Sequence, residues 1–156
     1  MIRAAGPDDA AAIHELVVAL ATYEREPDAV RATPESLRAQ RAAEHPPFEC
    51  LLAEEDGRAV GFALFFPTFS TWEGRPGLYL EDLFVREEAR GSGVGRALLV
   101  ALARLAVERG YGRLELAALD WNTPAIGFYE RLGAKAMDEW TVFRFAGESL
   151  ERLASE

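Results

Sequence analysis

Residues 80–99 read Leu-Glu-Asp-Leu-Phe-Val-Arg-Glu-Glu-Ala-Arg-Gly-Ser-Gly-Val-Gly-Arg-Ala-Leu-Leu, and this stretch decides the fold. It begins inside an apolar run, Leu78 to Val85, that predicts a buried strand. Three alternate glycines follow and open a predicted helix, which ends at Gly110. Strand, glycine-rich turn and helix N-terminus together predict an anion site, because glycines let backbone N–H groups turn toward a ligand and the helix dipole adds partial positive charge.

The glycine-rich loop does not match two common phosphate-binding motifs. A P-loop would require Gly-Lys-Ser/Thr, but Gly95 is followed by Arg96 and Ala97. A dinucleotide-binding fingerprint would require a third glycine where Arg96 stands. The loop instead resembles the acyl-CoA pyrophosphate loop of the GNAT acetyltransferases, Arg/Gln-x-x-Gly-x-Gly/Ala, with Arg90, Gly93 and Gly95 at the marked positions. A tight strand-to-helix turn without a ligand is the alternative interpretation.

Composition predicts one soluble, globular domain. The 156 residues, 49% hydrophobic and 28% charged, are expected to form one domain over 1–156. The net charge of −9 argues against nucleic acid as a partner and mildly favours small cations. No apolar run reaches the length of about 18 residues that a membrane span needs, and no targeting signal opens the chain, so a cytoplasmic location and no membrane partner are expected.

Nothing in the sequence predicts a metal site or a disulfide. Cys50 is the single cysteine and lies in an apolar run, which favours a packed core thiol over a nucleophile. His14 and His45 lie in no spacing typical of a metal centre or of a Ser-His-Asp relay, and surface roles are expected for both.

Hydrophobic periodicity and turn residues give the order of the elements. Strands are predicted over 1–5, 48–54, 59–66, 78–85, 113–119 and 140–145, with helices from 7, over 33–44, from 91 to about 109, over 123–132 and from about 148. Asp56-Gly57 predicts a hairpin turn, and Thr123 is expected to cap the fourth helix. Residues 67–77, with Trp72, are expected to form a loop that covers the core edge or a substrate entrance. The order predicts an α/β fold with a mixed sheet of about six to seven strands and helices on both faces.

A second motif begins 32 residues after Arg90. The sequence over 122–134 resembles a further GNAT motif, Asn-x-x-Ala-x-x-Phe-Tyr-x-x-x-Gly, with Asn122, Ala125 and Tyr129 among its matching positions. Two motifs in this order support membership of the GNAT superfamily and imply its fold over the whole chain. A plain turn residue at Asn122 and a core tyrosine at Tyr129 are the alternatives.

Further stretches resemble one branch of this superfamily, the spermidine/spermine N-acetyltransferases and the related thialysine N-epsilon-acetyltransferases. They are Ala-Thr-Tyr-Glu at 21–24, Glu-His-Pro at 44–46, Val-Gly-Phe-Ala at 60–63, Thr-x-x-x-Trp-x-Gly at 68–74 and Leu-Tyr-Leu-Glu-Asp-Leu-Phe-Val at 78–85. The stretch between Gly133 and Trp140 is shorter than in the animal enzymes, which leaves any substrate contacts from that stretch open.

The resemblance implies a set of site residues and acetyl-CoA as cosubstrate. The acetyl-CoA-binding residues would be Leu83, Phe84, Val85, Arg90, Gly91, Ser92, Gly93, Val94, Gly95, Arg96, Asn122, Thr123, Pro124, Ala125 and Tyr129. The amine would bind to Tyr23, Glu24 and Glu81, with Glu81 also on the base side and Tyr129 as the acid. A primary amine of a small molecule is the expected acceptor, and a protein or peptide amine or a non-catalytic CoA-binding module are the alternatives.

The chemistry of amine acetylation fits these residue types. An alkyl ammonium has a pKa near 10.4, so a carboxylate that accepts its proton, directly or through water, is the expected device. Glu81 and Asp82 are adjacent on a predicted strand, so their side chains are expected on opposite faces, with Glu81 toward the amine. A strand that diverges from its neighbour after Glu81 would offer backbone N–H groups of Leu83 to Val85 to the oxyanion.

An aromatic strand is predicted near the end of the sequence. Residues 140–145 read Trp-Thr-Val-Phe-Arg-Phe, and an apolar strand of this kind can pair or pack across a two-fold axis. Together with the resemblance, it predicts a homodimer. An edge strand inside one chain is the alternative.

Overall fold

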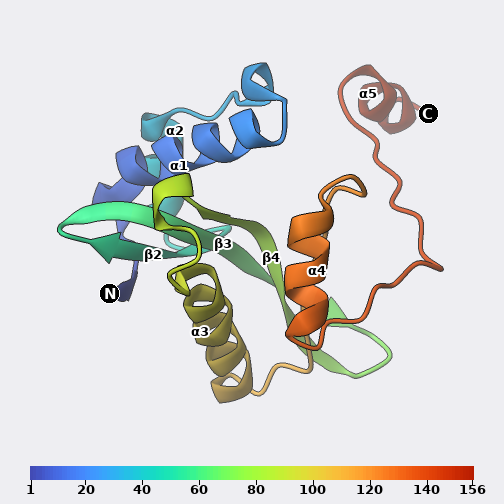
Figure 1. The fold of residues 1–156 in the computed structure, drawn as a ribbon. Helices are drawn as coiled ribbons and strands as arrows, with labels where there is room; N and C mark the ends of the chain where they lie inside the picture. Colours follow the sequence, from blue (N-terminus) through green and yellow to red (C-terminus); the bar gives the residue numbers. More distant parts are fainter. The chain divides into compact units, whose positions relative to one another are not determined.

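The computed structural model describes all of residues 1–156, and the chain divides into two units, residues 1–117 and residues 118–156 (Figure 1). The elements of the first unit are β1 (Ile2–Ala4), α1 (Ala10–Tyr23), α2 (Pro34–Arg41), β2 (Glu49–Glu55), β3 (Arg58–Ser70), β4 (Arg75–Val85), α3 (Val94–Glu108) and β5 (Leu114–Leu116). Single turns of 3₁₀ helix, η1 to η3, occupy Pro7–Asp9, Pro27–Ala29 and Glu87–Ala89. The second unit contains α4 (Thr123–Arg131) and α5 (Glu148–Ala154).

A mixed sheet of five strands forms the first unit, in the order β1-β2-β3-β4-β5. Neighbouring strands are antiparallel except β4 and β5, which are parallel. The β2–β3 hairpin turns at Asp56 and Gly57, whose φ angles of 49° and 76° suit a two-residue turn with the twist of the strands. The mixed sheet and this hairpin were predicted and are confirmed.

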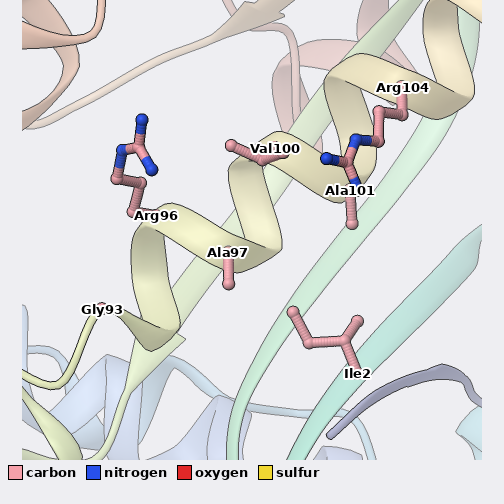
Figure 2. Close-up of a pocket in the computed structure, with 7 residues that line it drawn as sticks. All are labelled: Ile2, Gly93, Arg96, Ala97, Val100, Ala101 and Arg104. Carbon is pink, nitrogen blue, oxygen red and sulfur yellow. The ribbon is translucent and has the colours of Figure 1, made fainter.

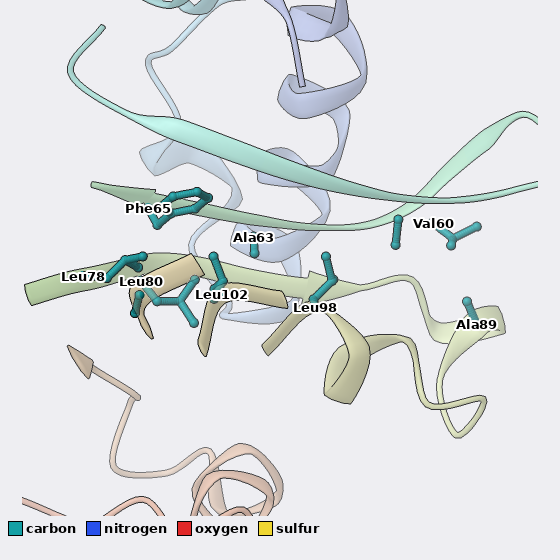
Figure 3. Close-up of a cluster of buried hydrophobic side chains, with 10 residues drawn as sticks. Val60, Ala63, Phe65, Leu78, Leu80, Ala89, Leu98 and Leu102 are labelled. Carbon is teal, nitrogen blue, oxygen red and sulfur yellow. The ribbon is translucent and has the colours of Figure 1, made fainter. Parts of the chain in front are cut away.

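Helices cover both faces of this sheet, as predicted. On one face α3 packs Leu98 and Leu102 against Phe65 of β3 and Leu80 of β4 (Figure 3). On the other face α1 contributes Ile13 and Leu16, which are 1% and 0% exposed, to a second cluster with strands β2 to β4. Cys50 belongs to this second cluster, so the prediction of a core thiol is confirmed.

The long β3–β4 hairpin corrects the prediction of a loop over 67–77. The ladder between β3 and β4 continues to the pair Ser70–Arg75, so only residues 71–74 form the turn. Phe66 and Tyr79 lie opposite each other in this ladder, and their stacked rings help to extend the hairpin. Trp72 lies at this turn and is 90% exposed, so it does not cover the core edge.

Two helix starts show how side chains satisfy free backbone N–H groups. Thr33 caps α2, as its Oγ1 accepts from the Ser36 N–H at 3.1 Å. In α4 the cap is Asn122, whose Oδ1 accepts from the Ala125 N–H at 3.4 Å, so the prediction that Thr123 caps this helix was wrong by one residue. None of the helices is both long and apolar enough to cross a membrane.

The predicted strand at residues 140–145 is absent, so the sheet has fewer strands than the six to seven expected. This segment forms no ladder, and Val142 and Phe143 are 84% and 85% exposed. A strand exists only when a partner supplies its ladder, and high β propensity does not replace that partner. The C-terminal helix predicted from about residue 148 is confirmed as α5.

Candidate active site

Strand β4 loses one neighbour halfway along its length. The parallel ladder with β5 ends at the pair Leu80–Leu116, whereas β4 continues to Val85. Backbone groups of residues 81–85 on that edge therefore face no strand, while β3 still holds the opposite edge. An open edge of this kind can present N–H groups to a ligand carbonyl. The ladder with β5 ends before Glu81, and the predicted divergence and the role of residues 83–85 stay predictions.

A β-bulge brings Glu81 and Asp82 to the same face of the sheet. In the β3–β4 register Leu64 pairs with Asp82 and Phe65 pairs with Leu80, which leaves Glu81 as the extra residue. Leu80 belongs to the core under α3, and Asp82 pairs with Leu64 from the core under α1, so the alternation of faces shifts between them. The expectation that these carboxylates point to opposite faces was wrong, because it assumed an unbroken strand.

The carboxylates on this face repel one another. Burial, together with the smaller effect of the negative charges of Glu81 and Glu24, raises the pKa of Asp82 to about 6. Burial also raises the pKa of Glu24, at the C-terminal end of α1. None of the three forms an ion pair within the protein. We call Glu24, Glu81 and Asp82 the acidic face, a group of carboxylates that form no ion pair with the protein's own cations.

The end of α1 supplies the remaining predicted amine-binding residue. Tyr23 is the last residue of α1, 37% exposed, and precedes Glu24 directly. The guanidinium of Arg90 lies 4.8 Å from the Tyr23 ring centroid. The fold thus brings Tyr23 and Glu24 from one end of α1 to the bulged part of β4, as the sequence motifs predict for residues that share a site.

The glycine loop has the backbone conformation of an anion cradle. Gly91 and Gly93 have φ angles of 78° and 91°, a region that side-chain-bearing residues rarely adopt, and Gly93 is the N-cap of α3. The Ser92 hydroxyl donates to the Ala89 carbonyl at 2.7 Å and closes the loop. The N–H groups of Val94, Gly95 and Arg96 occupy the first turn of α3, where no intrahelical acceptor exists.

A shallow hollow lies along α3 beside this loop (Figure 2). It measures about 530 Å³ and shares Gly93 and Arg96 with the loop. Its other lining residues are Ile2, Ala97, Val100, Ala101 and Arg104. Arg96, in the first turn of α3, adds positive charge near the helix N-terminus and favours an anionic ligand there, whereas Arg104 lies in the C-terminal half of the helix.

The second unit carries the other predicted motif. Asn122 is 7% exposed and, as the cap of α4, ties the motif's first residue to Ala125. The rings of Phe128 and Tyr129 meet edge to face, with centroids 5.2 Å apart. Thr123 and Pro124 form the exposed first turn of α4. The roles predicted for these residues stay predictions.

Sequence reasoning missed Tyr79 as a neighbour of the acidic face. Its ring stacks on Phe66 with centroids 5.4 Å apart, and burial raises its pKa, as do the charges of Glu81 and Glu115. The signal was available, since Tyr79 and Glu81 are two apart on one strand and therefore share a face. Asp82 was predicted to lie on the face opposite Glu81, because no local sequence pattern indicates the β-bulge between β3 and β4.

The cysteine and histidine side chains considered as nucleophiles or metal ligands form neither a metal centre nor a second catalytic site. No group of three or more His, Cys, Asp or Glu side chains has the arrangement of a metal centre. The Cys50 thiol is 2% exposed, and burial raises its pKa to about 12, so it is an unreactive core group. The His14 ring contacts the Ala32 carbonyl through Nε2 at 2.9 Å, a structural contact between α1 and the chain before α2.

Comparisons with known proteins agree with the two motifs. Residues 10–134 match the model of the Acetyltransferase (GNAT) family. The chain is 39% identical to thialysine N-epsilon-acetyltransferase of Bos taurus, with 100% of this chain and 98% of that protein covered. It is 32% identical to human spermidine/spermine N(1)-acetyltransferase-like protein 1, across 99% of this chain and 24% of that protein. Among solved structures, an integron cassette protein from the mobile metagenome of V. cholerae has a TM-score of 0.85 at 28% identity, with 100% and 98% of the chains covered.

Proposed function

The chain belongs to the GNAT acetyltransferase family, and we propose that it moves an acetyl group from acetyl-CoA to a primary amine of a small molecule. A polyamine, a diamine or a lysine analogue is the expected acceptor. The observation that carries the proposal is the acidic face beside the open edge of β4. A group of carboxylates without an ion-pair partner attracts cationic ligands, and the ammonium group of an amine substrate is such a ligand.

The proposed reaction is direct attack in a ternary complex. The neutral amine nitrogen attacks the thioester carbonyl and a C–N bond forms. As the tetrahedral intermediate collapses, the C–S bond breaks to release the CoA thiolate, and the nitrogen gives its surplus proton to water. Forming the free amine from an ammonium of pKa near 10.4 costs roughly 4 kcal/mol close to neutral pH. In this proposal Glu81 receives that proton, directly or through water, and lowers the barrier by general base catalysis.

Two further groups stabilise the charges that develop. Backbone N–H groups of Leu83 to Val85 on the open edge of β4 donate to the oxyanion of the tetrahedral intermediate. The phenol of Tyr129 gives its proton to the departing thiolate, which then leaves as CoA thiol. This role rests on the match of Phe128-Tyr129 to the family motif.

Acetyl-CoA binding is assigned to the glycine loop and the first turn of α3. Support comes from the positive φ angles of Gly91 and Gly93 and from the N–H groups at the start of α3, which suit a pyrophosphate. The test is a calorimetric titration of acetyl-CoA into wild type and Gly93→Asp, which adds charge and bulk at the cap. The variant is expected to lose at least tenfold in affinity, whereas equal affinities with intact folds would refute this assignment.

A peptide acceptor is the second candidate, and a non-catalytic CoA-binding module is the third. The small amine is favoured because the acidic face is a compact group next to Tyr23 and because 39% identity to a thialysine acetyltransferase extends over the whole chain. A non-catalytic module would bind acetyl-CoA without releasing thiol for any amine, which separates it from both enzymes.

The protein is further proposed to act as a homodimer in the cytoplasm. The support is the segment 140–145, whose side chains Val142, Phe143 and Phe145 are 84%, 85% and 61% exposed although they are strongly apolar. Burying them against a second copy would remove this apolar area from water. Light scattering at micromolar concentration is expected to give twice the mass of one chain, and a monomeric mass would refute the dimer.

A further inference from the structure

The side chain of Arg90 turns away from the glycine loop and toward the amine side of the site. Its Nε–H donates to the Val85 carbonyl at 2.9 Å. Its guanidinium carbon lies 4.8 Å from the ring centroid of Tyr23 and 5.5 Å from that of Phe84. One side chain therefore joins three parts of the molecule, namely the loop that begins at Gly91, the open end of β4 and the C-terminal residue of α1.

This combination of contacts suits arginine better than lysine. A planar guanidinium stacks on aromatic rings and still donates from its edge, whereas a lysine ammonium offers a point charge without a plane. No carboxylate forms an ion pair with Arg90. Phe84 is 8% exposed and packed in the core, so its ring has a fixed position against which the guanidinium lies. Tyr23 is 37% exposed and is the last residue of α1, and the Arg90 guanidinium is one of the groups that contact its ring.

We propose that Arg90 is a positioning residue for the amine: it holds the Tyr23 ring over the acidic face and couples that ring to the acetyl-CoA loop. The inference rests on the proposed function and deepens it. When acetyl-CoA orders the loop, Arg90 is ordered with it, and Tyr23 follows. Linkage then requires that acetyl-CoA tightens amine binding and that the amine tightens acetyl-CoA binding by the same factor.

A direct phosphate ligand would behave differently from a positioning residue. If Arg90 served only the pyrophosphate, its removal would raise the KM for acetyl-CoA and leave the KM for the amine unchanged. If it acts through Tyr23, its removal raises the amine KM, and the effect disappears once the Tyr23 ring is gone. The quantity to measure is therefore the coupling between substitutions of Arg90 and Tyr23 in their effects on the amine KM.

The test is a double-mutant cycle of Arg90→Gln and Tyr23→Leu, with steady-state KM for amine and for acetyl-CoA measured in each. Each single variant is expected to raise the amine KM roughly fivefold, the factor that corresponds to one partly exposed cation–π contact. The double variant is expected to show no more than the larger single effect. Arg90→Lys and Tyr23→Phe complete the set, since lysine keeps the charge without the plane and phenylalanine keeps the ring. In the Tyr23→Phe background, Arg90→Gln should retain its full effect.

Arg38→Gln is the matched control, because Arg38 is a surface arginine of α2 that pairs with Asp8 at 2.6 Å. It should leave both KM values unchanged. The inference is overturned if Arg90→Gln raises only the acetyl-CoA KM, or if the two amine effects multiply in the double variant. Should Arg90→Gln fail to fold, Arg90→Lys takes its place in the same cycle. A wild-type protein without amine turnover would refute the proposed function itself, and the inference with it.

Discussion

Two groups of carboxylates in the first unit differ in what surrounds them. At the β1 edge, the Arg3 guanidinium donates to both oxygens of Asp9 at 2.7 and 2.8 Å and to Glu54 at 2.7 Å. This bonding lowers the pKa values of both carboxyls. On the acidic face, burial raises the pKa values of Asp82 and Glu24, like charges raise that of Asp82 as well, and neither carboxylate forms an ion pair.

The difference separates carboxylates that build the fold from carboxylates that await a ligand. A paired carboxylate makes the folded state more favourable as soon as it ionises. A crowded, unpaired carboxylate does the reverse, so its persistence indicates a use other than stability. The following variants test whether the paired and the unpaired carboxylates differ in this way, from the largest expected effect to the smallest.

Glu81→Gln should lower kcat/KM for the amine by roughly 10²–10⁴-fold, because the amide cannot accept the ammonium proton. The matched change at the paired site, Glu54→Gln, should leave kcat/KM unchanged. Both are measured by release of CoA thiol. Equal activity of Glu81→Gln and Glu54→Gln would contradict the proposed role of Glu81 as the base.

Tyr129→Phe should lower turnover by a comparable factor, roughly 10²–10⁴-fold, because the thiolate loses its proton donor. Acetyl-CoA affinity should change little, as the ring remains. Single-turnover kinetics together with a binding titration separate the two quantities. Near-full turnover would show that water or another group protonates the thiolate.

Asp82→Asn should stabilise the protein at alkaline pH. A pKa raised to about 6 from the usual 3.8 means that ionised Asp82 opposes folding. The destabilisation by ionised Asp82 is therefore absent below about pH 4 and is fully present once the pH has risen through about 6. At about pH 8 the variant should gain up to about 3 kcal/mol in the free energy of unfolding, and the gain should vanish near pH 4. Urea unfolding at both pH values provides the measurement, and a loss of stability at pH 8 would contradict the contrast.

Asp9→Asn should show the opposite pH dependence and the smallest effect. The pKa of Asp9 is lowered in the folded state, so its contribution is present above about pH 4 and disappears as the pH falls through the folded pKa. The variant should lose about 1 kcal/mol at neutral pH, the scale of a partly exposed ion pair. Thermal melts from pH 7 to pH 3 test this, and a constant difference would show that the loss is not electrostatic.

Local patterns were sufficient for much of the fold. Asp56-Gly57, Thr33-Pro34 and the glycines of the loop each determine a turn or a helix start through their own φ preferences, and the structure has all three features. The predicted residues of the acidic face, Glu24 and Glu81, also come together because α1 packs on the sheet as its apolar stripe requires.

Features set by pairing between distant residues were not predictable in this way. The bulge at Glu81 depends on how β3 aligns with β4, and nothing in Leu80-Glu81-Asp82 itself specifies the shift. The segment 140–145 has the composition of a strand but forms none, because composition does not specify a neighbouring strand for it to pair with. The stacking of Arg90 on Tyr23 joins residues 67 apart in the sequence, which motifs read singly do not connect.

The central claim is that the acidic face receives the ammonium of a small amine for acetylation. A thiol-release screen with acetyl-CoA tests it most directly, using polyamines, diamines, lysine analogues, aminoglycosides and peptides as acceptors, with Glu81→Gln and Glu54→Gln beside the wild type. We expect turnover with at least one small primary amine, lost in Glu81→Gln and kept in Glu54→Gln. Turnover with peptides alone, or with no acceptor at all, would contradict the claim.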